Sequence, residues 1–290
     1  MYVKLHGLTL VETTVVIAII TIIMSLTLVA VQSVRESARR VKCQNNLHQL
    51  GIAITNFTQS SRVFPSLLAN RGSKGDASFE QSAFVTILPE LEVIVAKNDT
   101  NNIEQTPPPP ILRCPSSNEF LGYRYNYGSG VRALGKLDGI LRIYKGLAPS
   151  EITDGLSNTC LTAERMSGKD QTKPVGVASL PAYLTDLGFA NDCMQLDTPT
   201  TFVRDVGVKW QGYQPLDLVY THYSTPNKSH WDCQAGYLHQ LITARSLHSG
   251  GAFVLFADGH VSWVGSSMDL AAWRAWGTVA GHETVSDTSP

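Results

Sequence analysis

The feature that most constrains this chain is an apolar block close to its N-terminal end. Residues Leu8 to Val31 contain a single charged side chain, Glu12, and follow a short polar leader that ends at Gly7. As a helix, this block extends about 36 Å, which is enough to cross a hydrocarbon core about 30 Å thick. The block is longer than the apolar region of a cleavable secretory signal, and no good small-residue cleavage site follows it. We therefore expect a membrane-inserted N-terminal helix.

The charge of Glu12 needs a partner in this setting. A carboxylate deep in a spanning helix costs roughly 2.5 to 3.5 kcal/mol on insertion scales. Cleavage after Gly7 would make Leu8 a new N-terminus, and the amine of a neighbouring subunit would then pair with Glu12 in lipid. Such a pair favours side-by-side packing of identical helices. The alternative is an ordinary anchor whose Glu12 reaches the membrane interface.

Gly7, Leu8 and Glu12, with Thr9-Leu10-Val11 between them, resemble the prepilin motif of type IV pilins and of the pseudopilins of type II secretion. In those families a Gly precedes the cleavage point, a hydrophobic residue becomes N-methylated, and a Glu stands at mature position five. The resemblance implies that a prepilin peptidase cuts after Gly7, that Leu8 is N-methylated and that Glu12 acts in assembly with other pilin-like subunits. Leu8 departs from the commoner Phe.

The basic residues around the span and the prepilin resemblance favour opposite orientations of the chain in the membrane. Lys4 stands alone before the apolar block, whereas Arg35, Arg39, Arg40 and Lys42 follow it, which by the positive-inside rule keeps the body in the cytoplasm. Prepilin-like proteins are instead cut on the cytoplasmic side and their bodies are exported. The resemblance therefore implies a single pass through the cytoplasmic membrane, with an extracytoplasmic or periplasmic head that enters a surface filament if the protein polymerises.

An apolar stripe continues beyond the span with gaps of mostly three or four residues, which predicts one helix from about Leu8 to about Thr58. The predicted organisation is a leader at 1–7, a transmembrane segment at 8–31, an amphipathic continuation at 32–60 and a head at 61–290. The expected fold class is α+β and pilin-like, with the long helix packed on an antiparallel sheet and a loop-rich insertion. The stripe consists of Val34, Ala38, Val41, Leu47, Leu50, Ile54 and Phe57.

In the head, short apolar runs between Gly, Asp and Asn predict strands joined by short links. The segment from Lys169 to Leu241 has no clear period and is expected to be rich in loops, while Phe79 to Val95 predicts a helix and a short second element. The predicted strands are Tyr123–Tyr127, Ile140–Tyr144, Thr159–Ala163, Phe253–Phe256 and Val261–Val264.

Charge and cysteine content narrow the functional classes. With 23 Lys and Arg against 24 Asp and Glu, the chain offers no electrostatic case for nucleic acid. Its five cysteines include no C-x-x-C pair, which argues against a zinc or thioredoxin-like site. An exported head permits disulfides, and the first pairs to test are Cys43 with Cys114 and Cys193 with Cys233. Cys160 reads as a core strand residue, and one of the five must stay unpaired within the chain.

Asp258-Gly259 between two β-rich runs predicts a hairpin. With His248 ten residues earlier, the segment resembles the C-terminal His-x9-Asp-Gly motif of a large bacterial family with prepilin-type N-termini, whose biochemical role is largely undefined. His260 and His282 depart from the residues usual in that family. Further matching segments are Cys43–Gly51, Cys114–Ser116, Ile152–Thr159 with Glu164, and Ala280–Glu283.

We interpret these motif residues as structural. His248 and Asp258 would lie about 30 Å apart on an extended strand, so they are not expected to form a catalytic or metal pair. Asp154, Ser157 and Asn158 with Glu164 offer oxygen ligands for calcium, but Asp154-Gly155 and its neighbours also describe a plain turn, which we favour. Calcium stays open, and no other cofactor is expected.

No metal site and no enzyme are predicted elsewhere. The spacings of His222, His230, His239 and Cys233 match no familiar zinc pattern, and the fingerprints of serine hydrolases, nucleotide-binding loops and metalloproteases are absent from the sequence. The leading hypothesis is a pilin-like subunit of a filament or a type II secretion-like assembly. The alternative is a membrane-anchored extracytoplasmic module that binds a glycan or a protein and does not polymerise. Aromatic residues that serve either a core or such a contact surface are Trp210, Tyr213, Tyr220, Tyr223 and Trp231.

Overall fold

The computed structural model describes most of the chain after the leader. Gly7 and Leu8, the two predicted processing residues, lie outside the described residues, as does Tyr213. The described residues are 10–70, 80–93, 107–116, 122–128, 138–143, 145–166, 176–181, 185–203, 206, 210–211, 215–236 and 239–282.

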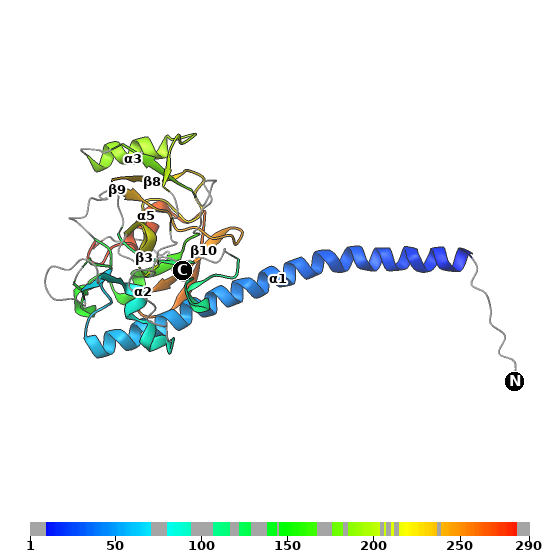
Figure 1. Cartoon of the computed structure of the whole chain (residues 1–290), viewed down its shortest axis with the longest axis horizontal. Coiled ribbons are helices and arrows are strands. Elements are labelled where there is room, and N and C mark those ends of the chain that lie inside the picture. Colours follow the sequence, from blue (N-terminus) through cyan, green and yellow to red (C-terminus); the bar gives the residue numbers. More distant parts are fainter. Residues whose placement is uncertain are drawn as a thin grey trace.

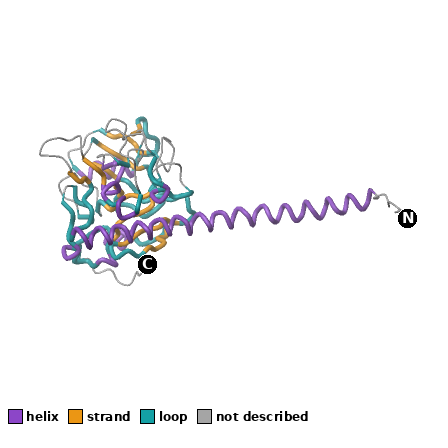
Figure 2. Tube along the Cα trace, turned by 60° about the horizontal axis from the view of Figure 1, so that its bottom comes forward, coloured by secondary structure: helices purple, strands orange, loops and turns teal. Residues whose placement is uncertain are grey.

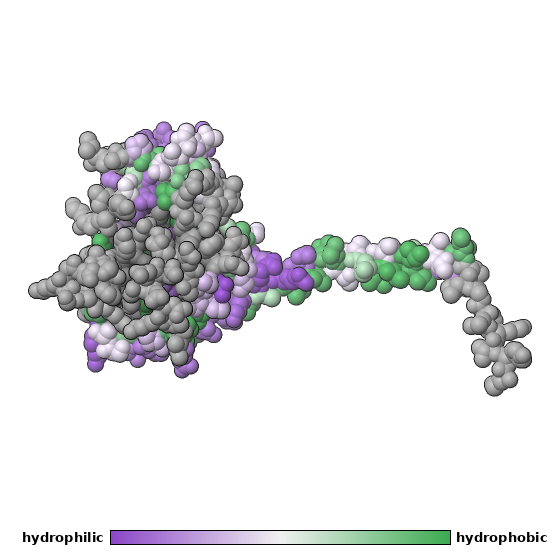
Figure 3. Space-filling model, viewed as in Figure 1, coloured by the Kyte–Doolittle hydropathy of each residue, from purple (hydrophilic) through white to green (hydrophobic). Residues whose placement is uncertain are grey.

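One continuous helix, α1 (Leu10–Ser61), dominates the shape of the molecule (Figure 1). Its N-terminal half projects away from the head and is apolar on its surface, whereas a polar collar marks the point where the helix reaches the head (Figure 3). Burial begins at Cys43, because only the C-terminal half packs on the head. The helix ends where Arg62 takes a left-handed φ of 65°, with its N–H bonded to the carbonyl of Thr58 at 2.9 Å.

The larger sheet has five strands in the order β11-β10-β4-β3-β7, and α1 lies against one of its faces. Along β10 the side chains alternate: Phe253 and Leu255 pack with α1, while Val254 and Phe256 pack with Trp273 of helix α5 (Leu270–Ala275) on the other face. The strands are β3 (Tyr123–Asn126), β4 (Cys160–Glu164), β7 (Val219–Tyr220), β10 (Gly251–Phe256) and β11 (Val261–Gly265).

A second sheet, with the order β6-β5-β8-β9, lies with helix α3 (Asp186–Met194) at the end of the head away from α1 (Figure 1). The 169–241 segment, which was expected to be rich in loops, therefore also contains strands and a helix that the sequence did not predict. Its strands were missed because the parallel β5–β8 pair joins residues far apart in sequence and leaves no local period. The strands are β5 (Val177–Leu180), β6 (Phe202–Val203), β8 (Asp232–Ala235) and β9 (His239–Leu241).

The expectation of an antiparallel head also needs correction, because both sheets are mixed. Strands β3 and β7 run parallel in the first sheet, and β5 and β8 run parallel in the second, while the other ladders are antiparallel. The overall class is α+β with one long apolar N-terminal helix.

The strand predicted at 140–144 does not form in the described residues 138–143. Ile140 and Leu141 are buried but make no ladder; instead the N–H of Leu141 bonds to the carbonyl of Asn126. The apolar character of Ile140 and Leu141 reflects their burial and does not indicate a strand. The remaining elements are β1 (Leu68–Asn70), β2 (Glu80–Ser82), α2 (Ala83–Thr86), η2 (Leu88–Leu91), η4 (Pro110–Leu112), η5 (Pro149–Glu151), η6 (Leu156–Asn158) and α4 (Pro215–Leu218).

Candidate functional site

Both ends of the His-x9-Asp-Gly segment rest on α1. At the Asp-Gly end, the β10–β11 turn approaches the helix so closely that a Cβ atom on Gly51 would lie 2.8 Å from Leu255 Cδ1 and 3.2 Å from the carbonyl oxygen of Gly259. Gly259 itself has a φ of 94°, a conformation that glycine adopts at little cost. The Asp258 carboxylate accepts a hydrogen bond from the N–H of His260 at 3.0 Å and so closes the turn.

At the other end, the buried imidazole of His248 meets three elements of the fold. Its Nδ1 lies 2.6 Å from Oε1 of Glu36 on α1. Its Nε2 lies 3.5 Å from Oε1 of Glu164 on β4 and 3.6 Å from Sγ of Cys114. His248 and Asp258 therefore have separate partners, and each fixes one end of the hairpin to its surroundings.

The charges at this end reinforce one another. Burial alone would lower the pKa of His248, but the carboxylates of Glu164 and Glu36 outweigh burial and raise that pKa above its ordinary value. Burial alone would raise the pKa of Glu36, but hydrogen bonds from His248 and Arg39 lower it. Each shift favours the charged form, so the contact between α1 and the hairpin includes an ion pair.

Arg40 closes this contact from the solvent side. Its guanidinium donates a hydrogen bond to the carbonyl of Ser249 at 2.8 Å and lies over the ring of Trp263, 4.9 Å from the centroid. Trp263 packs edge-on against Phe253 with centroids 4.9 Å apart. Glu36, Arg40 and Trp263 were not singled out from the sequence. The only signal was the four-residue spacing of Glu36 and Arg40, a common helix-surface pair.

A disulfide joins the same two parts covalently. Cys43 of α1 is bonded to Cys114 with an S–S distance of 2.01 Å. Beside it, the hydroxyl of Tyr123 donates to the carbonyl of Cys43 at 3.2 Å, and Nδ2 of Asn46 donates to the carbonyl of Arg113 at 2.8 Å. Together with the His248 contact, these bonds attach α1 to the head along several turns. The candidate site is this helix–hairpin junction, made of Glu36, Arg40, Cys43, Gly51, Cys114, Glu164, His248, Asp258 and Gly259.

Comparison with protein families matches residues 32–271 to the family described as a protein of unknown function (DUF1559). The chain belongs to this family. Comparisons with curated proteins and with solved structures find no significant match. The DUF1559 match starts just after the apolar block and contains every residue of the helix–hairpin junction, so the junction is part of the family region and the membrane-compatible segment precedes it.

A second motif of this DUF1559 chain, the turn at Asp154, fastens the C-terminal segment. The Asp154 carboxylate accepts hydrogen bonds from the hydroxyl of Thr278 and from the N–H groups of Gly281 and His282, at 2.8, 2.8 and 3.1 Å. Burial alone would raise the pKa of Asp154, but these N–H donors lower it.

The four residues considered for calcium do not form one site. Gly155 has a φ of 95°, and Nδ2 of Asn158 donates to the backbone carbonyl of Asp154 at 3.1 Å, as in a capped turn. Ser157 lies exposed on the same turn. Glu164 belongs instead to the His248 contact, which separates it from Asp154.

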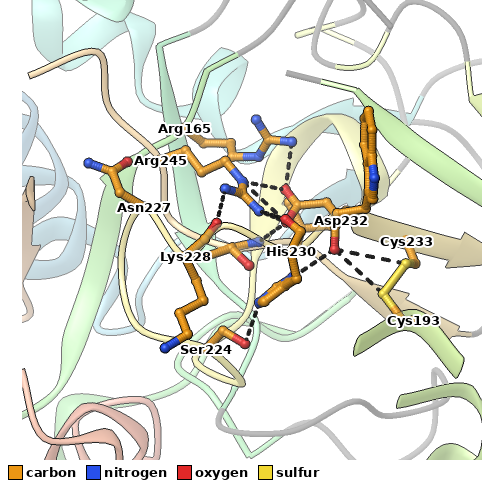
Figure 4. Close-up of polar contacts among 12 residues, drawn as sticks. Arg165, Cys193, Ser224, Asn227, Lys228, His230, Asp232, Cys233 and Arg245 are labelled. Carbon is orange, nitrogen blue, oxygen red and sulfur yellow. Dashed lines mark hydrogen bonds and ion pairs between the residues drawn. A yellow bond between two sulfur atoms is a disulfide. The ribbon is translucent and has the colours of Figure 1, made fainter. Parts of the chain in front are cut away.

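A buried charge cluster joins the two sheets of the DUF1559 fold and had no sequence signal (Figure 4). Asp232 of β8 lies 2.7 Å from Nη2 of Arg165 and 2.9 Å from Nη2 of Arg245, with all three side chains at most 3 % exposed. Burial alone would raise the pKa of Asp232, but Arg245 and Arg165 lower it. Arg245 also donates to the carbonyls of Lys228 and His230. Asp232 thus serves as the shared anion between the sheets.

The remaining histidines and aromatic residues serve the core. His222 is stacked on Trp273 and hydrogen-bonded to Tyr220, and His230 bonds to Ser224 at 2.7 Å. The sulfur of Cys233 is bonded to that of Cys193 at 1.98 Å. The two disulfides are the pairs that the sequence ranked first, and Cys160 is a buried free thiol of β4. Of the aromatic residues in question, Trp210 and Tyr220 are fully buried, whereas Tyr223 and Trp231 are partly exposed.

Proposed function

We propose that this DUF1559 protein is a membrane-anchored, pilin-like subunit that packs through its N-terminal helix. The observation that carries the proposal is the projecting half of α1. Every described residue from Leu10 to Val34 is exposed, and this part of the helix is long and apolar enough to span a membrane. Such a surface needs either lipid or other copies of the same helix to cover it.

Support also comes from exposed apolar residues of α1 that lie beyond the apolar block. Val34, Val41 and Ile52 are 68 %, 55 % and 50 % exposed. Their spacings of seven and eleven residues place them on one line along the helix, opposite the buried side that carries Leu47 and Leu50. If α1 contacted only lipid and its own head, these apolar side chains beyond the membrane would remain exposed to water. In a bundle of several copies, the neighbouring helices would bury them.

In the proposed pathway, prepilin peptidase cuts after Gly7 and Leu8 is N-methylated. Glu12, which lies in the first turn of α1, then pairs with the terminal amine of a neighbouring subunit. The subunit would enter a filament or a type II secretion-like assembly, with its head outside the cytoplasm. Its partners would be the peptidase, the membrane and other pilin-like subunits, and it would have no catalytic role.

Terminal mass analysis of protein purified from its own membrane tests the processing step, and a chain that still begins at Met1 contradicts it. Glu12→Ala tests assembly: cleavage should persist while incorporation into cross-linkable oligomers falls at least tenfold. Thr14→Ala, also exposed in the first turns of α1, is the matched control and should assemble normally.

The second candidate function is a membrane-anchored binding module that does not polymerise. The second sheet and helix α3, at the end of the head away from α1, support this candidate (Figure 1). This region has its own disulfide, and the side chain of Leu187 on α3 is exposed there. A glycan or a protein would bind there. Normal function of Glu12→Ala, together with loss of function in Leu187→Asp, would favour this module over the subunit.

A further inference from the structure

Four buried side chains of the helix–hairpin junction form a set of metal ligands. The ligand atoms of Cys43, Cys114, Glu164 and His248 all lie within 4.8 Å of one another. Two sulfurs, one imidazole nitrogen and one carboxylate oxygen are donors that Zn²⁺ takes in tetrahedral sites. The four residues come from α1, from the segment after η4, from β4 and from the segment before β10, so they meet only in the folded chain.

The imidazole is already oriented as a metal ligand. Its Nδ1 is hydrogen-bonded to Glu36 at 2.6 Å, which leaves Nε2 facing Cys114 and Glu164 at 3.6 and 3.5 Å. Metal-binding histidines characteristically donate their other ring N–H to a carboxylate, which fixes the tautomer and the ring orientation. Glu36 provides that carboxylate from α1.

Glu164 supplies an independent indication. Its Oε2 accepts a hydrogen bond from the N–H of Phe253 at 2.9 Å, but its Oε1 is buried and has no hydrogen-bond partner among the described residues. The imidazolium of His248 is the cation that faces this buried oxygen, and a bound metal ion would take over that role. This oxygen is the one that faces His248 Nε2.

We propose that reduction of the Cys43–Cys114 disulfide opens a binding site for one Zn²⁺-class ion, held by the two thiolates, His248 Nε2 and Glu164 Oε1. A dithiol reductant supplies two electrons and two protons, which break the S–S bond and give two thiols, while the dithiol becomes a disulfide. The ion then displaces both thiol protons and the Nε2 proton of the His248 imidazolium into solvent, while Nδ1–H stays hydrogen-bonded to Glu36. In the oxidised state the same sulfurs bond each other, so disulfide and metal alternate. In both states Cys43 keeps α1 attached to the head.

The test uses the full chain in detergent micelles, carrying Cys160→Ala so that one background thiol is removed. After anaerobic reduction, Co²⁺ should bind with the thiolate charge-transfer and visible bands of a tetrahedral site, and one equivalent of Zn²⁺ should displace it. The oxidised protein should show neither band. His248→Gln and Glu36→Gln should weaken Co²⁺ binding about 10- to 100-fold, since the second acts through the orientation of His248. His48→Gln, an exposed position on α1, should have no effect.

Three results would overturn the proposal. The first is a reduced, folded chain that shows no thiolate–cobalt band. The second is a band that persists in Cys43→Ser with Cys114→Ser, which would place the metal on Cys193 and Cys233. The third is a reduced chain that loses its structure and is not refolded by Zn²⁺, because a genuine site would stabilise the fold through binding.

Discussion

Gly51 illustrates how one residue determines whether two elements can meet. The turn of the His-x9-Asp-Gly hairpin approaches α1 at this position, and a side chain there would contact Leu255 and the backbone of Gly259. We expect Gly51→Val to lower the free energy of unfolding by about 1 to 3 kcal/mol, because the turn must move outward. Ile52→Val, on the exposed side of the same turn of helix, should change it by less than about 0.5 kcal/mol. Chemical denaturation of the full chain in micelles measures both; equal effects would contradict the close contact.

The anion Asp232 compensates two buried guanidinium groups at once. Asp232→Asn should therefore lower the free energy of unfolding by about 3 to 5 kcal/mol, because Arg165 and Arg245 would keep buried charges without their partner. Asp258→Asn provides a comparison at a partly exposed carboxylate and should cost less than about 1 kcal/mol. Thermal unfolding of both variants would distinguish them, and a mild Asp232 variant would show that the charge cluster contributes little.

His222 gives the protein a defined response to acid. Burial lowers its pKa to about 3, with the hydrogen bond to the carbonyl of Trp273 acting in the opposite direction. The folded chain keeps this imidazole neutral, while the unfolded chain protonates it below about pH 6.5. Stability from this group is therefore present above pH 6.5 and falls by about 1.4 kcal/mol per unit as the pH drops from there toward 3.

The comparison of wild type with His222→Gln at pH 7 and pH 5.5 isolates this effect. The wild type should lose about 1.2 kcal/mol more than the variant over that interval. His248 has the opposite shift, and its contribution is lost only as the pH rises above 6.5, so the two histidines titrate in separate windows. An identical pH slope for the two proteins would show that His222 is not neutral in the folded chain.

At the scale of elements, the two disulfides connect different parts. Cys43–Cys114 joins α1 to the head across 71 residues, whereas Cys193–Cys233 joins α3 to β8 across 40. Removing either by paired Ala substitution should cost about 4 kcal/mol in the chain-entropy account. Limited proteolysis should then differ: the first double variant should become sensitive around the docked half of α1, and the second only within the second sheet. The same cleavage pattern in both would contradict this division.

Local pattern predicted the elements whose signals lie close together in sequence. The continuous helix followed from apolar residues such as Leu47 and Leu50 at helical spacing, and the β10–β11 hairpin from Asp258-Gly259. The second sheet and the Glu36–His248 contact could not be predicted in this way. They join residues 55 and 212 positions apart, and nothing near either partner records the pairing.

The whole molecule is a rod with a head fixed at one end (Figure 2). Because α1 is one helix from Leu10 to Ser61, the projecting half has no hinge that separates its orientation from that of the head. The disulfide at Cys43 and the ion pair at Glu36 then fix the rotation of the head about the helix axis as well as its distance along that axis.

Because the helix is unbroken, the number of residues in α1 determines the angle of the head about the helix axis relative to the N-terminal part of the helix. Each residue inserted between Val31 and Val34 would turn the head by about 100° and advance it by about 1.5 Å. Inserting two alanines should disrupt the proposed packing of subunits, while inserting seven, which returns the head to within about 20°, should restore most of it. Yields of cross-linked oligomers from the two insertions would measure this dependence. Equal yields would mean that the packing of neighbouring subunits does not depend on the angle of the head. Unequal yields would mean that α1 can change in length during evolution only by insertions or deletions close to whole helical turns.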